Sequence, residues 1–444
     1  MESWNISIFE WRIRCIINSL HDTNMRISTN YTNHTNENRN SFTLIELLVV
    51  LALVAILSVV VVMTLNPAEL IKQARDSNRL SDLSTINTAL NLFSADVTSG
   101  FMGTSTVVYI SIPSVSPTCV GLGLPALPSG YTYNCVAIAN LRNTDGTGWI
   151  PVNFQRISSN SPISQLPIDP INTTTTRLYY SYVSGGSWEL NAAIEAAKNK
   201  PGGSNDLVSK DGGNAISTYE IGNNLILNPI ETGDSSLVGY WNFEEGPNTT
   251  STDRSGYGNH GTWYGTSTAQ EHYAAGKVGQ YAGSFNGNSD YIYSPTVTTN
   301  TSNMSISLWV KQSVASIVPV ALYYNGNSGS NGWGIFVSCS GPNNRIDILV
   351  GGRTCTAVNS TYVLPLQQWI NLAAVNQSGN WKIYANTVLV ASSQGALLPN
   401  VPSGVVGGIG FSNTTKLLGL VDEVRVYSRA LSDAEVSALY DAGK

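Results

Sequence analysis

The chain has 444 residues, more than the roughly 100 to 200 of a typical domain, so we expect two or three domains. Hydrophobic residues make up 42% and charged residues 12%, with 40 Gly and 18 Pro, which is typical of turn-rich β proteins and excludes overall disorder. The 23 basic and 29 acidic residues are spread along the chain and give a net charge of −6, so we expect no nucleic-acid partner. The four histidines and the isolated cysteines form no zinc-binding pattern.

The most apolar segment runs from Phe42 to Leu65 and is interrupted only by Thr43, Glu46, Ser58 and Thr64. At ~1.5 Å per residue, a helix of this length spans a bilayer core of ~30 Å. The segment therefore predicts a single membrane-spanning helix. A carboxylate at Glu46 costs at least ~2.5 kcal/mol at membrane depth unless it is paired, so we expect a partner for it.

Residues 1–41 precede this helix and end in a polar stretch, Asn30 to Ser41. A polar leader before an apolar segment is the order of an export signal, but this apolar segment is too long for an ordinary signal peptide and carries a carboxylate. Residues 1–24 are rich in Trp and Ile, unlike a short polar leader. We interpret them as a misassigned start, with Met25 as the true one, or as an unexplained extension.

The sequence Ser41-Phe42-Thr43-Leu44-Ile45-Glu46-Leu47-Leu48-Val49-Val50 resembles the prepilin cleavage and methylation motif of type IV pilins and type II secretion pseudopilins. The resemblance implies that a prepilin peptidase cuts after Ser41 and that the new amino terminus on Phe42 is methylated. It also implies that Glu46 pairs with the terminal amine of a neighbouring pilin subunit. Most of the chain would then lie outside the cytoplasm, first at the cell membrane and later in a surface filament. The family usually has Gly where this chain has Ser41, which puts the efficiency of cleavage in question.

Residues 42–97 are predicted to form one transmembrane and stalk helix, kinked at Pro67 because proline is tolerated in a first helical turn. Beyond Pro67, apolar residues recur every three or four positions on one face. They are Ile71, Ala74, Leu83, Ile86, Leu90, Phe93 and Val97. The charged residues are expected mostly off this stripe: Lys72, Arg75, Asp76, Arg79 and Asp82.

Residues 98–225 are predicted to form a small α+β head of short strands separated by turns. The expected strands are Val107 to Ile112, Tyr131 to Ala137, Trp149 to Phe154, Leu178 to Val183 and Trp188 to Leu190. Leu166 to Pro170, Tyr179 to Tyr182 and Trp188 to Leu190 resemble the strand region of major pseudopilins. The acidic residues Asp206, Asp211 and Glu220 are scattered, so the calcium loop of that family is not expected here.

Four cysteines are expected outside the cytoplasm, where disulfides persist. Cys119 and Cys135 bracket a Pro/Gly-rich loop and are predicted to pair. Pairing of Cys339 with Cys355 is left open. If the strand Arg345 to Val350 lies between theirs, they are ~10 Å apart, whereas a disulfide needs Cα atoms within ~6.8 Å.

A polar boundary at residues 226–235 precedes a second region, residues 236–444, with many short alternating strands. The expected strands are Leu237 to Glu244, Ser305 to Val310, Gly334 to Ser338, Arg345 to Val350, Trp369 to Val375, Trp381 to Tyr384 and Leu420 to Tyr427. This number of strands predicts an independently folding two-sheet jelly roll. Ser432 and Glu435 are spaced as a capping box for a last helix to about Tyr440.

This region resembles the laminin G-like, concanavalin A-like jelly-roll family over nearly its whole length. The matching pieces are Leu237 to Glu244, Asp253 to Gly261, Ser284 to Gly287, Ser305 to Val310 and Asp422 to Tyr427. The resemblance implies a module that binds carbohydrate or protein, often with a structural calcium ion.

For calcium, the candidate ligands are Asp253, Asp290 and Asp422, because hard cations take carboxylate oxygens. The alternative is that Asp253 caps its Gly-rich turn and Asp422 accepts hydrogen bonds from backbone amides. Aromatic side chains that stack on sugars, if exposed, are the second set of candidates, although most aromatics in such a fold form the core. They are Tyr257, Trp263, Tyr264 and Trp333.

Enzymatic activity is not expected. A glycosidase needs two carboxylates facing each other across ~5 to 9 Å, whereas Glu244 and Glu245 are neighbours in an expected strand and so point to opposite faces. Asp422 and Glu423 have the same problem. His260 and His272 have no nucleophile motif nearby, and His260 is expected to be structural.

Two functions remain. In the first, a minor pilin-like subunit displays the β domain at the filament surface, where it binds glycans or proteins in adhesion. In the second, the subunit serves assembly or initiation of a type IV pilus or a type II secretion pseudopilus, and the β domain is inert. The size of the β domain favours the first, since such an appendage on every subunit would crowd a filament.

Overall fold

The computed structural model describes residues 43–128, 130–213, 215–231, 233–327, 330–341, 343–351, 358–393, 397–403, 407–410 and 416–444. The side chains of residues 59–65, 359 and 407 are not among those described. The expected leader, residues 1–41, and Phe42 lie outside these ranges. Within them, the structure contains no helix that combines the length and the apolarity needed to cross a membrane. The chain divides into two compact units after Leu65, and each is considered separately.

The first unit contains helix α2 (Leu44–Leu65), which is apolar apart from Glu46, Ser58 and Thr64. Every side chain described in this helix is exposed. Leu44 is 77% exposed and Val50 is 49% exposed.

The second unit begins with helix α3 (Pro67–Asp96). The helical path is interrupted at Asn66, whose φ of 38° lies in the left-handed region, and Pro67 occupies the first position of the new helix. We expected one helix kinked at Pro67, whereas the structure has one helix that ends at Leu65 and another that begins at Pro67. Proline is tolerated at this first position because the first turn of a helix leaves its N–H groups unused. The predicted apolar stripe is confirmed at Leu83, Ile86 and Phe93, which are fully buried.

The amino-terminal part of the stripe was predicted wrongly. Ile71 is 56% exposed, whereas Asp76 and Arg79 are fully buried. Arg79 donates to Asp76 and to Asp169, and it also pairs with Glu195 at 2.8 Å. The helix therefore packs on the head through an ion cluster at this end and through apolar side chains further along.

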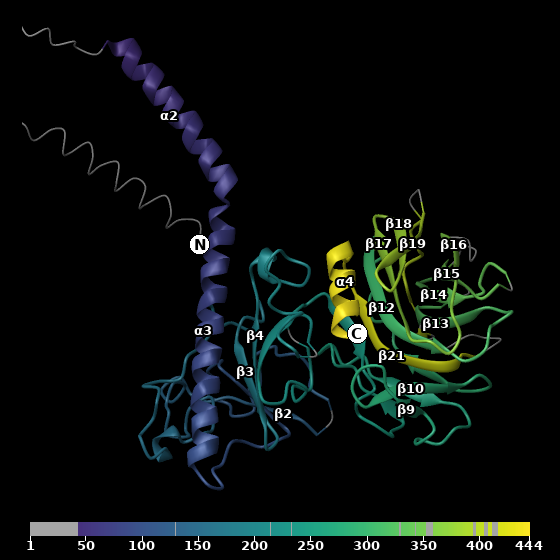
Figure 1. Cartoon of the computed structure of the whole chain (residues 1–444), viewed down its shortest axis with the longest axis horizontal. Helices are drawn as coiled ribbons and strands as arrows, with labels where there is room; N and C mark the ends of the chain where they lie inside the picture. The colour runs from purple at the N-terminus through teal and green to yellow at the C-terminus, as the bar shows by residue number, and fades with distance from the viewer. Residues whose placement is uncertain are drawn as a thin grey trace, which may run out of the picture. The chain divides into compact units, whose positions relative to one another are not determined.

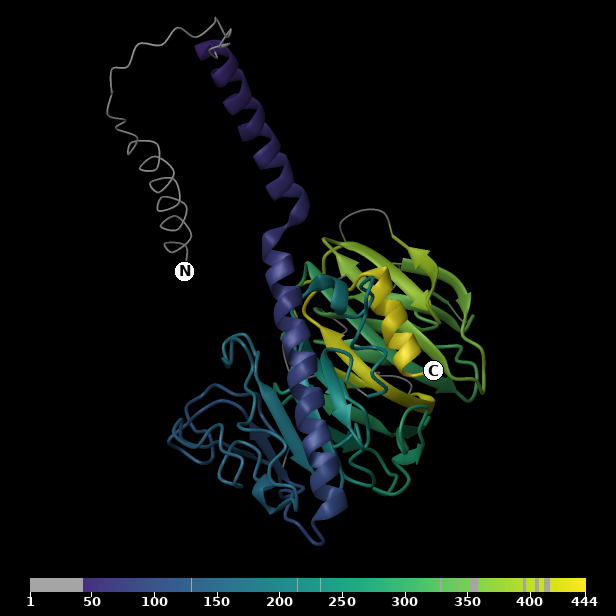
Figure 2. The same cartoon turned by 60° about the vertical axis from the view of Figure 1, so that its left-hand side comes forward.

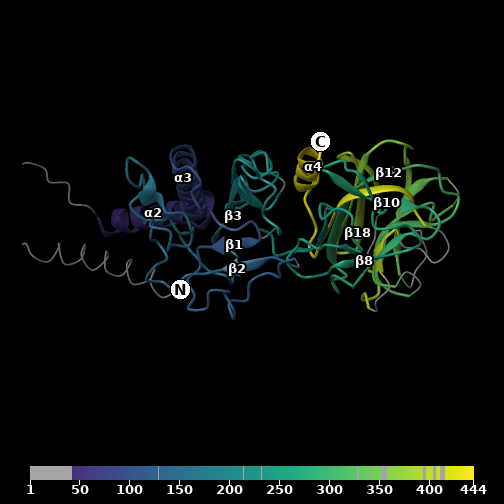
Figure 3. The same cartoon turned by 90° about the horizontal axis from the view of Figure 1, so that it is seen from below.

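The head contains one sheet with the strand order β2-β1-β3-β4-β5, and α3 lies across it (Figure 2). The strands are β1 (Val107–Ile110), β2 (Thr132–Asn134), β3 (Tyr180–Ser184), β4 (Trp188–Ala193) and β5 (Thr218–Gly222). Figure 3 shows β1, β2 and β3 beside one another, with β1 parallel to β2 and antiparallel to β3.

Trp149 to Phe154 is not the strand that we expected. Its apolar side chains are buried, but the backbone is irregular and leads into the 3-10 helix η1 (Phe154–Arg156). A second 3-10 helix, η2 (Ala197–Asn199), follows β4.

Cys119 and Cys135 form the predicted disulfide, with Cα atoms 5.4 Å apart. The bridge packs in a small apolar cluster with Val108, Ile110 and Tyr179 on one side of the head sheet. Cys355 lies outside the described residues, so its pairing with Cys339 stays a prediction. The strand Arg345–Val350 does lie between its two neighbours in a meander, as we assumed.

The C-terminal region is all β apart from its last helix, and it confirms the expected two-sheet jelly roll. One sheet has the order β19 (Val388–Ser392), β18 (Asn380–Ala385), β17 (Ile370–Gln377), β12 (Asn303–Gln312), β21 (Leu418–Tyr427), β10 (Tyr281–Asn286) and β9 (Tyr273–Ala275), and β6 (Leu237–Trp241) also pairs with β21. The other has the order β16 (Val358–Val363), β15 (Arg345–Val350), β14 (Trp333–Val337), β13 (Val320–Asn325), β20 (Gly407–Ile409), β11 (Tyr291–Ser294), β8 (Gly261–Tyr264) and β7 (Thr250–Ser251).

The core of this region lies between the two sheets. Alternate residues of β12, among them Ile306 and Leu308, face Ile335 and Ile348 of the second sheet in one buried cluster. Since side chains alternate across a strand, the intervening residues cover the outer faces.

Helix α4 (Asp433–Ala442) covers part of an outer face (Figure 1). It begins at the predicted capping box, in which Ser432 and Glu435 bond each other's backbone N–H groups. Val436 and Leu439 pack against Ala373 of β17 and Tyr384 of β18.

The segment at residues 226–235, expected to be a polar linker, contains a buried carboxylate. Glu231 accepts a hydrogen bond from the backbone N–H of Ile216 and lies 3.6 Å from Arg425 Nε. Ile216 belongs to the same apolar cluster as Tyr427 and Leu439 of the β region. The head and the β region therefore share buried contacts at this boundary.

Candidate functional site

The first candidate site is the beginning of α2, where Glu46 lies three residues after Thr43. The Glu46 carboxylate accepts hydrogen bonds from Thr43 N at 2.8 Å and Thr43 Oγ1 at 2.9 Å. Glu46 N in turn donates to Thr43 Oγ1 at 3.3 Å. This reciprocal arrangement caps the helix and holds the carboxylate beside the residue that follows Phe42. Ser41 and Phe42, the expected processing residues, lie outside the described residues.

A second candidate site is an aromatic surface on the outer face of β8 and β11. Tyr264, which we expected as a sugar-stacking residue, is 47% exposed and lies opposite Tyr291 in the sheet. The two rings are stacked, with centroids 5.3 Å apart and an interplanar angle of 11°. Tyr293 packs edge-on against Tyr264 at 6.1 Å, and Lys416 Nζ lies 4.3 Å from the centre of the Tyr291 ring. We call Tyr264, Tyr291 and Tyr293 the tyrosine surface.

The family described as the concanavalin A-like lectin/glucanases superfamily matches residues 286–437, and the prokaryotic N-terminal methylation motif matches residues 37–62. The chain carries a prokaryotic N-terminal methylation motif and a concanavalin A-like domain. This confirms the fusion that the sequence predicted. No curated protein matches the sequence.

Three similar solved structures each cover just under half of the chain. Domain 4 of an extracellular arabinanase from Geobacillus stearothermophilus, solved with arabinotriose, is 22% identical and has a TM-score of 0.36, covering 46% of this chain and 98% of that one. A Trypanosoma rangeli sialidase is 15% identical, with a TM-score of 0.34, 47% of this chain covered and about a third (33%) of the sialidase. The botulinum neurotoxin serotype G binding domain is 20% identical, with a TM-score of 0.33, 46% of this chain covered and 50% of that domain.

Two expected aromatic candidates of the concanavalin A-like domain, Trp263 and Trp333, are not exposed. They are 5% and 0% exposed, respectively, and both belong to the core between the sheets. Trp263 alternates with Thr262 and Tyr264 in β8 and so points inward. Tyr257 is 46% exposed, but its hydroxyl donates to Ser235 O and the guanidinium carbon of Arg177 lies 5.4 Å from its ring centre. Tyr257 and Tyr264 are therefore the exposed residues of the four, at 46% and 47%.

The three expected calcium ligands are not brought together. Asp253 accepts four hydrogen bonds, from Tyr240 N, Ser255 N, Ser255 Oγ and Asn259 N, which is the turn-organising alternative that we considered. Asp422 accepts from Lys277 N and Val278 N. Asp290 lies at the start of β11 and accepts from Ser267 N. Among the described residues, no three acidic, His or Cys side chains are arranged to hold a metal ion, so these carboxylates do not fit a shared calcium.

The expectation for Glu244 and Glu245 was wrong. Strand β6 ends at Trp241, and Phe243 has a φ of 62°, so the two glutamates lie in a turn and not in a strand. Both line one cavity of about 470 Å³. Asp422 and Glu423 do lie in a strand, as expected. Glu423 pairs with Arg425 and Tyr240 in a buried cluster.

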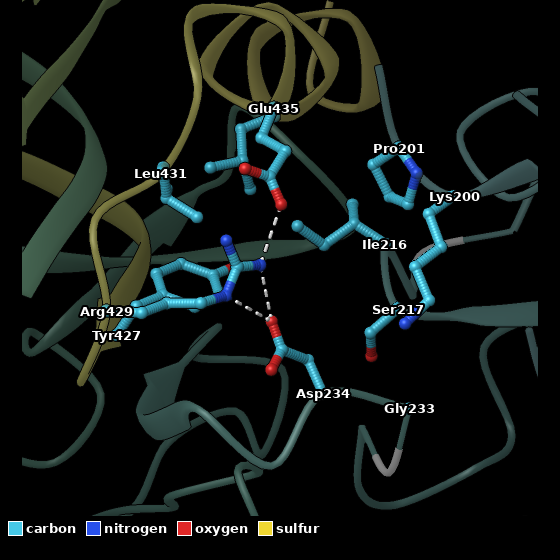
Figure 4. Close-up of a pocket in the computed structure, with 11 residues that line it drawn as sticks. Lys200, Pro201, Ile216, Ser217, Gly233, Asp234, Tyr427, Arg429, Leu431 and Glu435 are labelled. Carbon is cyan, nitrogen blue, oxygen red and sulfur yellow. Dashed lines mark hydrogen bonds and ion pairs between the residues drawn. The ribbon is translucent and has the colours of Figure 1, made fainter. Parts of the chain in front are cut away.

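Another cavity, of about 280 Å³, lies between α4, the end of β21 and the head (Figure 4). Arg429 projects into its centre and is 2.7 Å from both Asp234 and Glu435. Ile216, Leu431 and Leu439 provide apolar walls. Since its central charge is neutralised by two carboxylates, we interpret this cavity as part of the packing between the head and the concanavalin A-like domain.

The tyrosine surface was only partly predictable. Tyr291 and Tyr293 were missed because no local motif marks them. The signal available was alternation, since the sequence Tyr291-Ile292-Tyr293 places both tyrosines on the face opposite to the buried Ile292.

Proposed function

We propose that the protein is a minor pilin-like or pseudopilin-like subunit whose concanavalin A-like domain binds carbohydrate at a filament or cell surface. The observation that carries this proposal is the presence of both sequence matches in one chain. The methylation motif supports processing by a prepilin peptidase and assembly with other pilin subunits. The concanavalin A-like domain supports a ligand that lies outside the cytoplasm.

The exposure of α2 supports the first half of the proposal. A helix whose described apolar side chains are all exposed needs an apolar environment, which a bilayer and later the α2 helices of neighbouring subunits would supply. In that environment the Glu46 carboxylate needs a cation, and the amine released on Phe42 of a neighbouring subunit is the partner that we propose.

The tyrosine surface supports the second half. A sugar ring buries its C–H face on an aromatic ring. Tyr264 is 47% exposed, and its ring stacks face to face on that of Tyr291, which holds it in position. Lys416 lies over the Tyr291 ring.

Binding of the full chain to a glycan and matrix-protein array tests the proposal. The protein is solubilised in a detergent without a sugar head group, and binding is measured with calcium and with chelator. We expect saturable binding to glycans, reduced about tenfold by Tyr264→Ala and retained by Tyr264→Phe, which keeps the ring. Absence of binding in both conditions would favour the alternative of an assembly subunit with an inert β domain. Loss of binding with chelator would restore the calcium hypothesis.

A further inference from the structure

The cavity that contains Glu244 and Glu245 is a polar cleft of about 470 Å³, within the range of roughly 300 to 1,000 Å³ typical of small-ligand sites. Its walls come from the turn after β6, from the β7 segment, from the loop before β8 and from the head. Its lining includes Tyr131, Glu245, Asn248, Arg254 and His260. It is separate from the tyrosine surface, with which it shares no lining residue.

Two buried polar atoms in this cleft have no hydrogen-bond partner within the described part of the chain. They are Glu245 Oε2 and Arg254 Nε. The other oxygen of the same carboxyl, Glu245 Oε1, accepts from Tyr273 Oη at 2.8 Å, so the side chain is fixed in position. Buried polar atoms in native proteins are almost always paired with protein, water or ligand. An acceptor and a donor left unpaired in one cleft therefore point to a ligand or ordered water between them.

Other groups of the cleft have a defined hydrogen-bonding direction. His260 Nδ1 accepts from Asp253 N at 3.1 Å, so the proton of the neutral ring is on Nε2, which is left as a donor. Asn248 Oδ1 accepts from Thr249 N at 2.7 Å, which leaves the Asn248 amide nitrogen as a donor. The cleft thus presents several donors around one buried carboxyl.

The ligand that matches this pattern is polyhydroxylated, because each hydroxyl both donates and accepts. A sugar hydroxyl can therefore pair with an acceptor such as Glu245 Oε2 and with a donor such as Arg254 Nε. The lining of the cleft includes two carboxyl groups, Glu244 and Glu245, and one guanidinium, Arg254. It therefore has no excess of positive charge that would bind an anionic sugar. Burial raises the pKa of Glu245 to about 7, so this carboxyl is able to donate as well as to accept near neutral pH.

We propose that this cleft binds the end of a neutral oligosaccharide, with Glu245, Arg254, His260 and Asn248 holding its hydroxyl groups. The inference rests on the proposed function and deepens it, because it names the sugar class and a specific site. Tyr131 brings the head into this site, so the concanavalin A-like domain alone would lack one wall.

The test uses the full chain in the same sugar-free detergent. The probes are neutral trisaccharides of glucose, galactose, mannose, xylose or arabinose, with trigalacturonic acid as the anionic probe. Binding is measured by calorimetry and by saturation-transfer NMR. We expect at least one neutral trisaccharide to bind and the anionic probe not to bind. Glu245→Gln keeps an acceptor for Tyr273 but turns the second oxygen into a donor, and it should weaken binding about tenfold or more.

Arg254→Ala should weaken binding similarly, and the exposed Asn248→Ala provides a second test that does not disturb the interior. Thermal unfolding checks that each variant is folded. Glu271→Gln is the matched control, because it makes the same carboxyl-to-amide change at an exposed side chain that does not line the cleft, and it should leave trisaccharide binding unchanged. Wild-type binding that survives Glu245→Gln and Asn248→Ala would overturn the cleft assignment and leave the proposed function standing. Preference for the anionic probe, or release of reducing ends from a neutral one, would also overturn it. Failure of every trisaccharide to bind, with binding on the array retained, would overturn the cleft assignment alone, and failure in both experiments would overturn both proposals.

Discussion

Arg79 and Asp169 form a fully buried, two-pronged ion pair between α3 and the head, with Nε–Oδ2 at 2.6 Å and Nη2–Oδ1 at 3.0 Å. Removing Asp169 leaves Arg79 Nε and Nη2 buried without these acceptors, although Asp76 and Glu195 still balance the Arg79 charge, and a buried polar group left unsatisfied costs ~1–3 kcal/mol. We therefore expect Asp169→Ala to lower the free energy of unfolding by about that amount, measured by urea denaturation of the full chain in detergent.

The matched control is the exposed pair of Lys382 and Asp433, at 2.9 Å, in which the side chains are 42% and 70% exposed. Lys382→Ala should cost less than ~1 kcal/mol, because solvent screens exposed ion pairs. Equal losses in the two variants would contradict the role that we give to burial.

The disulfide between Cys119 and Cys135 closes a loop with a sequence separation of 16. Loss of a bridge over a loop of this size costs ~3 kcal/mol, chiefly because the unfolded chain gains freedom. The double variant Cys119→Ser/Cys135→Ser should be less stable by about that amount in urea denaturation without reductant. Each single serine variant should lose a similar amount, since either change removes the bridge. A double variant as stable as the wild type would show that the bridge does not constrain the unfolded chain.

Much of the fold was predictable because local signals determined it. The capping box of Ser432 and Glu435, the place of Pro67 in the first turn of α3 and the strand Arg345–Val350 all depend on neighbouring residues alone. The two-sheet core followed from strict alternation. The burial of the charged residues Asp76 and Arg79 was not predicted. One partner of Arg79 in the ion cluster is Asp169, which is 90 residues away, and no local pattern indicates so distant a partner.

The candidate sites also divide into features that have a local sequence signal and features that have none. Tyr264 was one of four aromatic candidates, and the alternation that buries Trp263 and exposes Tyr264 in the same strand was not used to separate them. Glu244 and Glu245 were misplaced because the positive φ of Phe243, which ends the alternation, has no marker such as Gly or Asn. The polar cleft was missed entirely, since its walls come from turns of the concanavalin A-like domain and from Tyr131 of the head. No local sequence pattern indicates that these separate segments lie together in the fold.

The Glu46 carboxylate has two separable roles, as a helix cap and as a charge. Glu46→Gln leaves an oxygen able to accept from Thr43 N and Thr43 Oγ1, but removes the charge that a neighbouring amine needs. We expect both Glu46→Gln and Glu46→Ala to insert into the membrane and to be missing from sheared filaments, judged by immunoblotting of membrane and filament fractions. Normal incorporation of the Gln variant would show that the charge is dispensable and would contradict the pairing that we propose.

Processing should depend on the size of residue 41. Ser41→Gly, which restores the residue usual in the prepilin family, should be cleaved at least as fast as the wild type, and a bulky Ser41→Phe should block cleavage. Pulse labelling followed by amino-terminal sequencing measures both effects. Mature protein beginning at Phe42 in the Ser41→Phe variant would contradict the dependence of cleavage on the size of residue 41.

Three carboxyl groups crowd together in the head beside β4 and β5. Glu189 Oε1 and Glu220 Oε1 are buried and have no hydrogen-bond partner among the described residues. Burial, and then the charge of Glu189, raises the pKa of Glu220, and burial raises the pKa of Asp211 to about 7. A carboxyl with a raised pKa in the folded state holds its proton more tightly there than in the unfolded chain. The stability that it contributes is therefore present below the unfolded pKa of ~4 and is lost as pH rises through the folded value.

We expect the free energy of unfolding to fall between pH 5 and pH 8, and Glu220→Gln to reduce that fall. The Gln oxygen can still accept from Ala215 N, which lies 2.7 Å from the Glu220 carboxylate, while its amide N–H is available to Glu189 at every pH. At pH 8 this variant should be more stable than the wild type by ~1–3 kcal/mol, the cost of leaving a buried polar group unsatisfied. Urea denaturation across this pH range provides the measurement.

Glu271→Gln is the control, because hydrogen bonds from Thr268 lower the pKa of that exposed carboxyl and its replacement should leave the fall in the free energy of unfolding unchanged. A wild type equally stable at pH 5 and pH 8 would mean that the cluster holds a cation, or a proton, that keeps it neutral throughout.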